Sequence, residues 1–446
     1  MRALVVLAAF AGLLVLAVMH PQAGLFAWGW LTLMQPHREA WGLGNANLNL
    51  IVALVTIVLW LASKEPKKPL AEPTSILVIL FILWMGVSQV YSLRPEYSWY
   101  YFIEFSKIMA FIFLAMVLLS RKSRIHAMIV ILCISIGYYS VKGGIFTILT
   151  GGAHHVFGPV MTMITDNNHM GGAAVFILPL LNYLRMQTDA RWIRIGLLFA
   201  IVLTVFCVLG TQSRGAFIAL AVVALPFWWR SRHRLWLAVV LLPLAIGALQ
   251  FMPESWSARM QTIRQAGEDA SFQGRLDAWV IATEIALANP LTGGGFRVAY
   301  LQDVADAHLA EPRQARAAHS IYFEILGSMG FVGLALFVSI LLLAFRNAAW
   351  IRRHARNQSG LQWAGDLAAM AQISLLAYAI AGAALSLEFW EAPWLMFVML
   401  TRLRHGVEAY LLERKTAIDT AEKTYDSYAI PVLSETGGAG AKVPRC

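Results

Sequence analysis

The sequence predicts an all-α fold, a polytopic bundle of about 12–13 transmembrane helices with one long loop that contains short helices. Two observations predict it. Hydrophobic residues make up 59% of the 446 residues, and charged residues make up 13%, against roughly a quarter in soluble domains. Apolar runs of about 17–25 residues, long enough to cross a bilayer, recur along the chain. Too little polar surface remains for a water-facing shell, so we expect lipid around most of the chain.

The apolar runs place the spans. They lie at residues 3–19, 22–34, 45–62, 74–91, 99–119, 125–149, 168–186, 194–210, 214–230, 234–251, 319–345, 362–387 and 393–411. The first run lacks a small-residue cleavage site behind it, so we expect a retained segment rather than a signal peptide. The second run is short for a crossing, which leaves a re-entrant or tilted piece open and the total at twelve or thirteen.

Basic residues fall on every second connection, which orients the chain because lysine and arginine collect on the cytoplasmic side. The basic connections are at 63–73, 121–124, 185–194, 230–234 and 346–356. The alternate connections, which we place in the periplasm, are at 92–98, 150–167, 252–318 and 388–392. We therefore expect a multi-pass inner-membrane protein with a cytoplasmic C-terminus.

Four regions follow from this division. They are N-terminal transmembrane helices at 1–251, a periplasmic loop at 252–318, C-terminal transmembrane helices at 319–412, and a cytoplasmic tail at 413–446. The tail is polar with a Gly/Ala-rich end, and we expect it to be disordered. Within the loop, the spacing of apolar residues predicts an amphipathic helix over 274–289, with Leu276, Trp279, Val280, Thr283, Ile285 and Leu287 around one side.

The composition also excludes several classes of partner. A net charge of +10 would favour nucleic acid in a soluble protein, but here it reflects the cytoplasmic loops, and no nucleic-acid-binding motif occurs. Cys133, Cys207 and Cys446 form no CxxC and no Cys/His cluster, so we expect neither disulfide nor zinc. No Asp-x-Asp motif occurs either, and we expect no metal and no cofactor.

Three charged or titratable residues stand beside apolar spans, where charge is costly. Arg214 is either an interfacial arginine or an anion contact, because its planar fork suits phosphate oxygens. Arg275 is either a loop charge paired with Asp277 or a second anion contact. His319 is either an interfacial histidine or a general base, since its ordinary pKa suits proton transfer at neutral pH. The three lie on one side of the membrane around one loop, which favours a site.

Three stretches of the chain carry a family resemblance. They are Thr211–Ala216; Gly274-Arg275 with Trp279, Asn289–Leu291 and Gly293–Phe296; and His319–Tyr322 with Gly327, Gly330 and Gly333. The chain resembles the O-antigen ligase and polymerase superfamily of bacterial inner-membrane glycosyltransferases. Met34–Arg38 with Trp41-Gly42, and Phe157–Pro159 before Asp166–His169, are similar to its O-glycosylation ligase branch of the exosortase A system. The usual His-Asn is His319-Ser320 here, which puts any role of that asparagine in doubt.

The resemblance implies a donor glycan on undecaprenyl diphosphate and a site that faces the periplasm. Arg214 and Arg275 would hold the diphosphate without a metal, and His319 would activate the acceptor hydroxyl, with inversion at the anomeric carbon. Ser213 and Tyr322 lie in the same motifs and are expected to bind substrate. The acceptor would be a protein, a lipid or a polysaccharide.

Secondary candidates keep two interpretations each. Asp166, Asn167 and Asn168 would bind sugar hydroxyls or cap the next helix. Glu388 and Glu391 would be exposed rim charges or acceptor contacts.

Two alternative functions stay open. One is a polymerase that joins lipid-linked repeat units, which would share the donor site and the base. The other is a polysaccharide transporter or flippase, although the paired broken helices of inverted-repeat transporters are not visible in the sequence.

Overall fold

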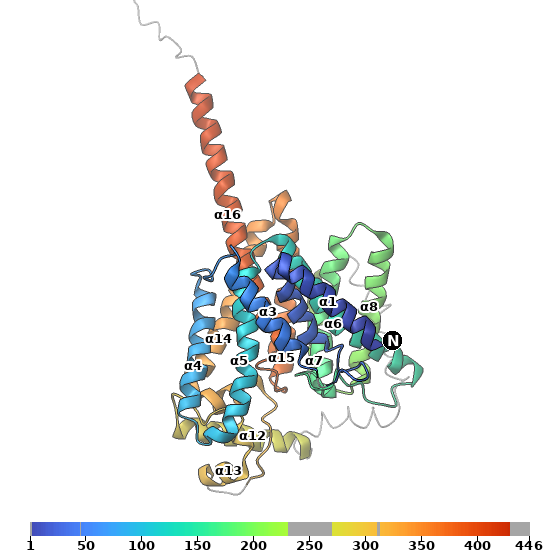
Figure 1. Cartoon of the computed structure of the whole chain (residues 1–446), viewed down its shortest axis with the longest axis vertical. Helices are drawn as coiled ribbons and strands as arrows, with labels where there is room; N and C mark the ends of the chain where they lie inside the picture. Colours follow the sequence, from blue (N-terminus) through green and yellow to red (C-terminus); the bar gives the residue numbers. More distant parts are fainter. Residues whose placement is uncertain (1, 45, 231–269, 310–312, 429–446) are drawn as a thin grey trace, which may run out of the picture.

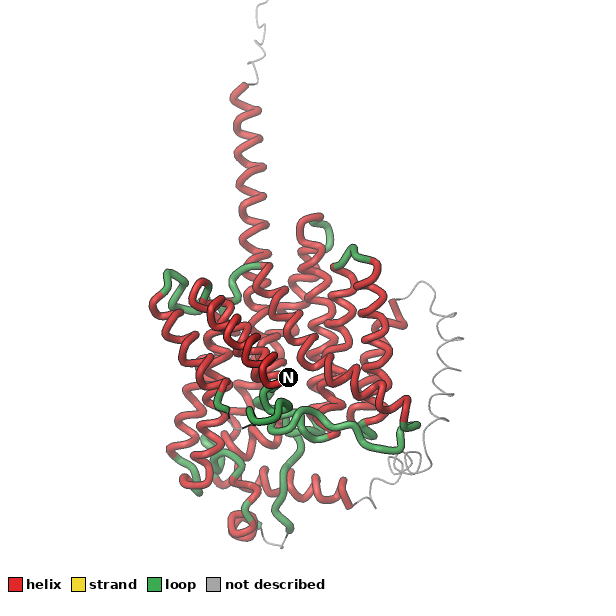
Figure 2. Tube along the Cα trace, turned by 45° about the vertical axis from the view of Figure 1, so that its right-hand side comes forward, coloured by secondary structure: helices red, strands yellow, loops and turns green. Residues whose placement is uncertain are grey.

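The computed structural model describes residues 2–44, 46–230, 270–309 and 313–428, and these ranges contain helices and loops but no strand (Figure 2). The α-helices are α1 (Arg2–Met19), α2 (Pro21–Met34), α3 (Leu48–Ala62), α4 (Pro73–Val90), α5 (Pro95–Leu118), α6 (Lys122–Leu149), α7 (Asn167–Gln187), α8 (Arg191–Gly210), α9 (Arg214–Arg230), α12 (Ala270–Ala288), α13 (Gln302–His308), α14 (Ile321–Ala355), α15 (Gln362–Gly382) and α16 (Glu391–Tyr428). Two short 3-10 helices are η1 (Val298–Tyr300) and η2 (Ser359–Leu361). The predicted all-α class is confirmed.

Six of the described helices are long and apolar enough to cross a membrane, namely α4, α5, α6, α8, α14 and α15 with η2. Three further segments are apolar but shorter: Ala3–Met19, Leu48–Ala62 and Arg214–Trp228. The chain is therefore a multi-pass membrane protein, while the total of twelve or thirteen crossings stays a prediction. The predicted span at 234–251 lies outside the described residues.

Several boundaries differ from the prediction. The disordered tail was placed from residue 413, but α16 continues as a helix to Tyr428. Glu413, Arg414, Lys415 and Ala417 lie in the first part of this extension, and all four residue types favour helix. In Figure 1 the extension projects from the body of the bundle. The span predicted at 362–387 is shorter in the structure. The helix α15 ends at Gly382, which leaves a connection at 383–390 before α16.

The connections gather at two opposite ends of the bundle. At one end the Arg124 guanidinium lies 2.5 Å from the Glu65 carboxylate, which joins two of the basic connections. At the other end the Leu93 N–H donates to the Gly294 carbonyl at 2.9 Å, which joins two of the alternate ones. Figure 1 shows α12 and α13 at this second end, opposite the projecting part of α16. We call the end with α12 and α13 the site face.

A break in α14 anchors the long loop on the site face. Gly330 has φ 68° and ψ −169°, outside the helical region, so α14 consists of two pieces. The Gly294 N–H donates to the Gly327 carbonyl at 2.8 Å. A Cβ on Gly293 would lie 2.6 Å from the Gly330 nitrogen, so the two backbones touch only because both residues are glycine. The glycines of the motif thus hold the first piece of α14 in place.

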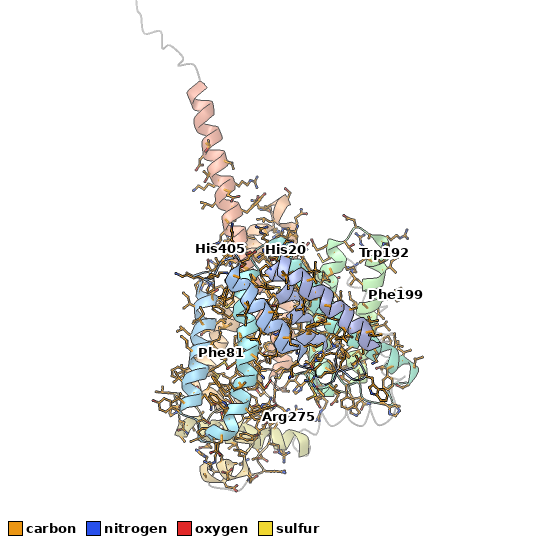
Figure 3. The ribbon with its side chains drawn as sticks, viewed as in Figure 1. His20, Phe81, Trp192, Phe199, Arg275 and His405 are labelled. Atoms are coloured by element: carbon orange, nitrogen blue, oxygen red, sulfur yellow. The ribbon has the colours of Figure 1, made fainter. Side chains whose placement is uncertain are left out.

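Aromatic packing anchors the connection at 383–390. The Phe389 ring is stacked on Phe105 of α5, with ring centroids 4.0 Å apart and an interplanar angle of 13°. Phe81 of α4 packs against both Phe389 and Trp394, and all four side chains are buried. This cluster, whose Phe81 is labelled in Figure 3, makes the connection a rigid wall beside α14.

The amphipathic helix of the loop is α12, and its buried side differs from the predicted one. Ala278, Ile281, Ala282 and Ile285 are buried, and α12 packs against α14. Leu287, which was placed on the apolar side, is exposed.

Candidate active site

An open pocket with about 380 Å³ of empty space lies between the beginnings of α7 and α9, the end of α15, and α12. Its lining consists of Asn168, Gln212, Ser213, Arg214, Gly215, Arg275, Ala384 and Leu385. Arg275, which is labelled in Figure 3, lies toward the site face. Four of the predicted site residues therefore come together from three helices, and two of them are arginines.

The turn between α8 and α9 presents the start of α9 to this pocket. Gln212 has φ 53°, and its side-chain amide donates to the Gly152 carbonyl at 3.1 Å, which holds the left-handed turn. The Ala216 N–H donates to Ser213 Oγ at 3.3 Å, so Ser213 caps α9. Ser213 is buried, and its hydroxyl has a structural partner in addition to its place in the pocket lining. Arg214 is the first residue of the helix.

The start of α7 lies beside the start of α9. The Asn168 N–H donates to Asp166 Oδ1 at 2.8 Å, so Asp166 caps α7. The Asn167 side chain donates to the Thr211 carbonyl at 2.8 Å and ties α7 to the turn before α9. The capping interpretation is confirmed for Asp166, while Asn168 also lines the pocket. Two helix N-termini thus meet at the pocket. The Asp166 carboxylate already occupies that of α7, and that of α9 favours an anion.

Close packing keeps these two N-termini together. A Cβ on Gly171 of α7 would lie 2.7 Å from Ala216 Cβ and 2.8 Å from Thr211 Oγ1. Only a glycine allows α7 to approach the start of α9 this closely.

Arg275 lies on α12, in a loop that contains further arginines. Asp277, proposed above as its partner, forms an ion pair with Arg313. Arg316 packs over the backbone of Gly274. Positive charge therefore gathers at this wall of the pocket, as binding of an anion requires.

His319 lies directly before α14 and within the field of Arg275. Burial lowers the pKa of His319, and the positive charge of Arg275 lowers it further, while Glu324 and Asp166 oppose these effects. The imidazole is therefore neutral at pH 7 and able to accept a proton. Its ring centroid lies 6.3 Å from that of His169 on the first turn of α7.

Tyr322 has a partner outside the pocket. Its hydroxyl donates to the Ala379 carbonyl of α15 at 3.0 Å, and it is not among the pocket-lining residues.

Arg297 is a charged residue that the sequence analysis missed. Its guanidinium carbon lies 4.9 Å from the Tyr101 ring centroid, 5.7 Å from that of Phe105 and 5.4 Å from that of Tyr300. Burial disfavours its charge, but Tyr300 and the carboxylates of Glu388 and Glu324 raise its pKa overall. Its position directly after Gly293–Phe296 was the one available signal.

The interpretation of Glu388 and Glu391 as exposed rim charges is wrong. Glu388 is 2% exposed and Glu391 is 7% exposed. Burial, together with the nearby Glu324 carboxylate, raises the pKa of Glu388 to about 8. Hydropathy near a helix end does not reveal this burial, because groups that face Glu388, such as Glu324 and Arg297, come from α14 and the long loop.

One group of side chains among the described residues has a spacing that suits a metal ion. Ligand atoms of Glu72, His405 and Glu408 lie within 4.8 Å of one another. Figure 3 places His405 at the end opposite Arg275, so this group is not part of the pocket.

Two protein families match parts of this chain. No curated protein matches the chain. Residues 1–189 match a family of unknown function (DUF5935). Residues 199–338, which contain Arg214, Arg275 and His319, match the O-antigen ligase family. This match supports a ligase-type glycosyl-transfer activity in the membrane and confirms that the chain carries a domain of the O-antigen ligase and polymerase superfamily.

Proposed function

We propose that this protein is an inner-membrane glycosyltransferase that moves a glycan from undecaprenyl diphosphate to an acceptor hydroxyl on the periplasmic side. The observation that supports it most is the pocket, where Arg214, Arg275 and the N-terminus of α9 come together, with His319 within the field of Arg275. An anionic group of the donor fits this arrangement, because guanidinium forks pair with phosphate oxygens.

The two arginines would act on the leaving group. As the bond between the anomeric carbon and the diphosphate oxygen breaks, its electron pair passes to the diphosphate. Arg214 and Arg275 offset that negative charge, and the N–H groups at the start of α9 add to the effect. These charges are in place before the reaction, so little reorganisation is needed during it.

His319 would act on the acceptor. The neutral imidazole takes the proton of the acceptor hydroxyl, and the oxygen attacks the anomeric carbon from the face opposite the diphosphate. The products are a glycoside of inverted configuration, undecaprenyl diphosphate and a protonated His319. Asn168, at the pocket wall, is placed to contact a sugar hydroxyl.

The charge distribution supports the orientation. The basic connections, such as the one joined through Arg124 and Glu65, lie at the end opposite the site face. Since basic loops stay in the cytoplasm, the site face would be periplasmic and α16 would project into the cytoplasm. A lipid-linked donor would then reach the pocket from the outer leaflet.

The test is complementation of a deletion strain of the native host. Wild type, Arg214→Ala, Arg275→Ala and His319→Ala are compared for surface glycoconjugates and for lipid-linked donor. Arg353→Ala, an exposed arginine near the end of α14, is the matched control. We expect all variants in the membrane at normal levels, full transfer with the control, and donor accumulation without transfer in the other three.

Two results would decide otherwise. Transfer that persists in all three site variants contradicts the proposal. Loss of a glycan ladder in the deletion strain assigns the polymerase reaction, whereas a retained but unattached polymer assigns the ligase reaction.

A further inference from the structure

Glu324, on the first turn of α14, joins four segments of the site face. One carboxylate oxygen, Oε1, accepts hydrogen bonds from the Tyr300 hydroxyl at 2.7 Å, the Ser386 hydroxyl at 2.7 Å and the Ala318 N–H at 3.0 Å. The side chain is 5% exposed. A buried carboxylate is costly unless it is hydrogen-bonded, and here three donors converge on it. Glu324 thereby links α14 to the long loop, the 383–390 connection and the segment before His319.

Both backbone polar groups of Ala318, the residue before His319, are hydrogen-bonded. Glu324 accepts a hydrogen bond from the Ala318 N–H, and the Trp279 indole N–H donates to the Ala318 carbonyl at 2.7 Å. Trp279 is itself stacked on Phe323, with ring centroids 4.8 Å apart and an interplanar angle of 8°. The residue that precedes the histidine therefore has no freedom to rotate.

His319 needs such support because its backbone is strained. Its φ is 47°, in the left-handed region that residues other than glycine rarely adopt. A conformation of this kind persists where the surroundings over-determine it. The hydrogen bonds on both sides of Ala318 are such surroundings, and they keep the imidazole 6.3 Å from the His169 ring, measured between centroids.

We propose that Glu324 is the positioning residue of His319, holding the histidine backbone in its left-handed conformation so that the imidazole meets the acceptor hydroxyl. This inference rests on the proposed function, because it assigns His319 the role of base. Glu324 touches neither substrate nor reacting atoms. Its effect passes through the Ala318 peptide and through its negative charge.

The charge of Glu324 gives the role a specific signature. The charged and titratable groups that face His319 are Arg275 from α12, Arg297 from the long loop, Asp166 and His169 from the start of α7, and Glu324 itself. Of these, Glu324 and Asp166 raise the pKa of His319, and Arg275 and Arg297 lower it. Removal of the Glu324 charge therefore moves the acid limb of the pH–rate profile to lower pH, which a purely structural defect would not do.

The experiment measures transfer in detergent-permeabilised membranes of the deletion strain. The donor is the lipid-linked glycan extracted from that strain, and the acceptors are those of the membranes. We expect Glu324→Gln to lower the maximal rate by about 10-fold, with little change in the KM for donor, because a neutral amide oxygen accepts the three hydrogen bonds less strongly than a carboxylate does. Its acid limb moves to lower pH. Glu413→Gln, at an exposed glutamate on the projecting part of α16, keeps the wild-type rate and profile.

If Glu324→Gln does not accumulate in the membrane, three conservative variants still test the positioning role. Tyr300→Phe and Ser386→Ala each remove one donor to Oε1, and Trp279→Phe removes the donor to Ala318 while it keeps an aromatic ring on Phe323. Each lowers the maximal rate by a smaller factor than Glu324→Gln and leaves the KM for donor unchanged.

The outcomes separate the inference from the function on which it rests. Full transfer by His319→Ala overturns both. An inactive His319→Ala, together with a wild-type rate, an unmoved acid limb or a raised donor KM in Glu324→Gln, overturns the positioning role alone. If Glu324→Gln cannot be measured, wild-type rates in all three conservative variants overturn that role.

Discussion

At the scale of the residue, the site combines two side chains that keep their charge with one that must be neutral. Arg214 and Arg275 stay charged at any working pH, which suits a ligand that is always an anion. His319 loses its proton readily because burial and Arg275 lower its pKa. In the proposed reaction the same arginine would serve two steps, because it would hold the leaving group and it lowers the pKa of the proposed base.

The pH dependence of transfer follows from this pairing. Because the pKa of His319 lies below its ordinary value of 6.5, the neutral base persists below pH 6.5 and activity is lost as the pH falls through the lowered pKa. We expect the acid limb of kcat/KM for donor, which reports the pKa of the base in the free enzyme, to lie below pH 6.5. Arg275→Gln removes one cause of the lowering, so its limb moves upward. A wild-type limb at or above pH 6.5 would contradict the assignment.

The arginines allow a test of geometry against charge. Arg214→Ala and Arg275→Ala each remove a donor aimed at the leaving group, and we expect a loss of about 10²–10³-fold in turnover. Lysine keeps the charge but not the planar fork, so Arg214→Lys and Arg275→Lys recover part of the loss. Equal activity of the lysine and alanine variants would exclude a charge-based role. Initial rates at matched protein levels decide between these outcomes.

At the scale of the element, the site depends on helix starts and on glycines that let backbones touch. Ser213 and Asp166 cap α9 and α7 at the pocket, and Gly171 lets the two helices approach. On the other wall, Gly330 breaks α14 so that the glycine-rich loop can dock beside it. These features carry no chemistry, but they set the distances between the groups that do.

Gly171→Ala tests the helix contact. The added methyl group would lie 2.7 Å from Ala216 Cβ, so α7 and the start of α9 must move apart. We expect a loss of about 1–3 kcal/mol in stability from overpacking, together with a clear fall in transfer. Thermal unfolding of the detergent-purified protein gives the first quantity and the membrane assay gives the second.

Gly86→Ala on α4 is the matched control, because a Cβ there meets no atom within 4 Å. Alanine in a helix interior is favoured over glycine, so this variant keeps wild-type stability or gains slightly. If Gly171→Ala behaved in the same way, the tight approach of α7 to α9 would not matter to the site.

At the scale of the whole molecule, polar chemistry is divided between two ends of an apolar bundle. The pocket and its arginines occupy the site face, and the basic connections and the extension of α16 occupy the opposite end (Figure 1). Such a division is required of a protein that would use a lipid-linked substrate from one leaflet only.

The orientation can be measured by cysteine labelling in intact cells with a permeabilised outer membrane. Cys133 and Cys207 are buried, and Cys446→Ser removes the third thiol. In that background we expect Ala307→Cys on α13 to react with an impermeant maleimide before lysis. Lys415→Cys on α16 reacts after lysis only. The reverse labelling pattern would show that α13 faces the cytoplasm and α16 the periplasm, against the proposed orientation.

The sequence by itself determined the solvent and the elements of this protein. Thirteen per cent charge excludes a water-facing shell, and the long apolar runs correspond to the described helices within a few residues at most ends. It also singled out Arg214, Arg275 and His319, because a charge beside an apolar run is costly and therefore visible. These signals are local patterns, so they can be recognised in a single sequence.

Only the tertiary structure decided which of these groups meet and what holds them. Glu324 and Ser386 are 62 residues apart, and Gln212 and Gly152 are 60 apart, so no local pattern predicts either hydrogen bond. The buried Glu388 faces Glu324 and Arg297, which come from other segments of the chain. Hydropathy reports the average environment of a segment. A site depends instead on single atoms that packing brings together, and this packing exists only once the chain has folded.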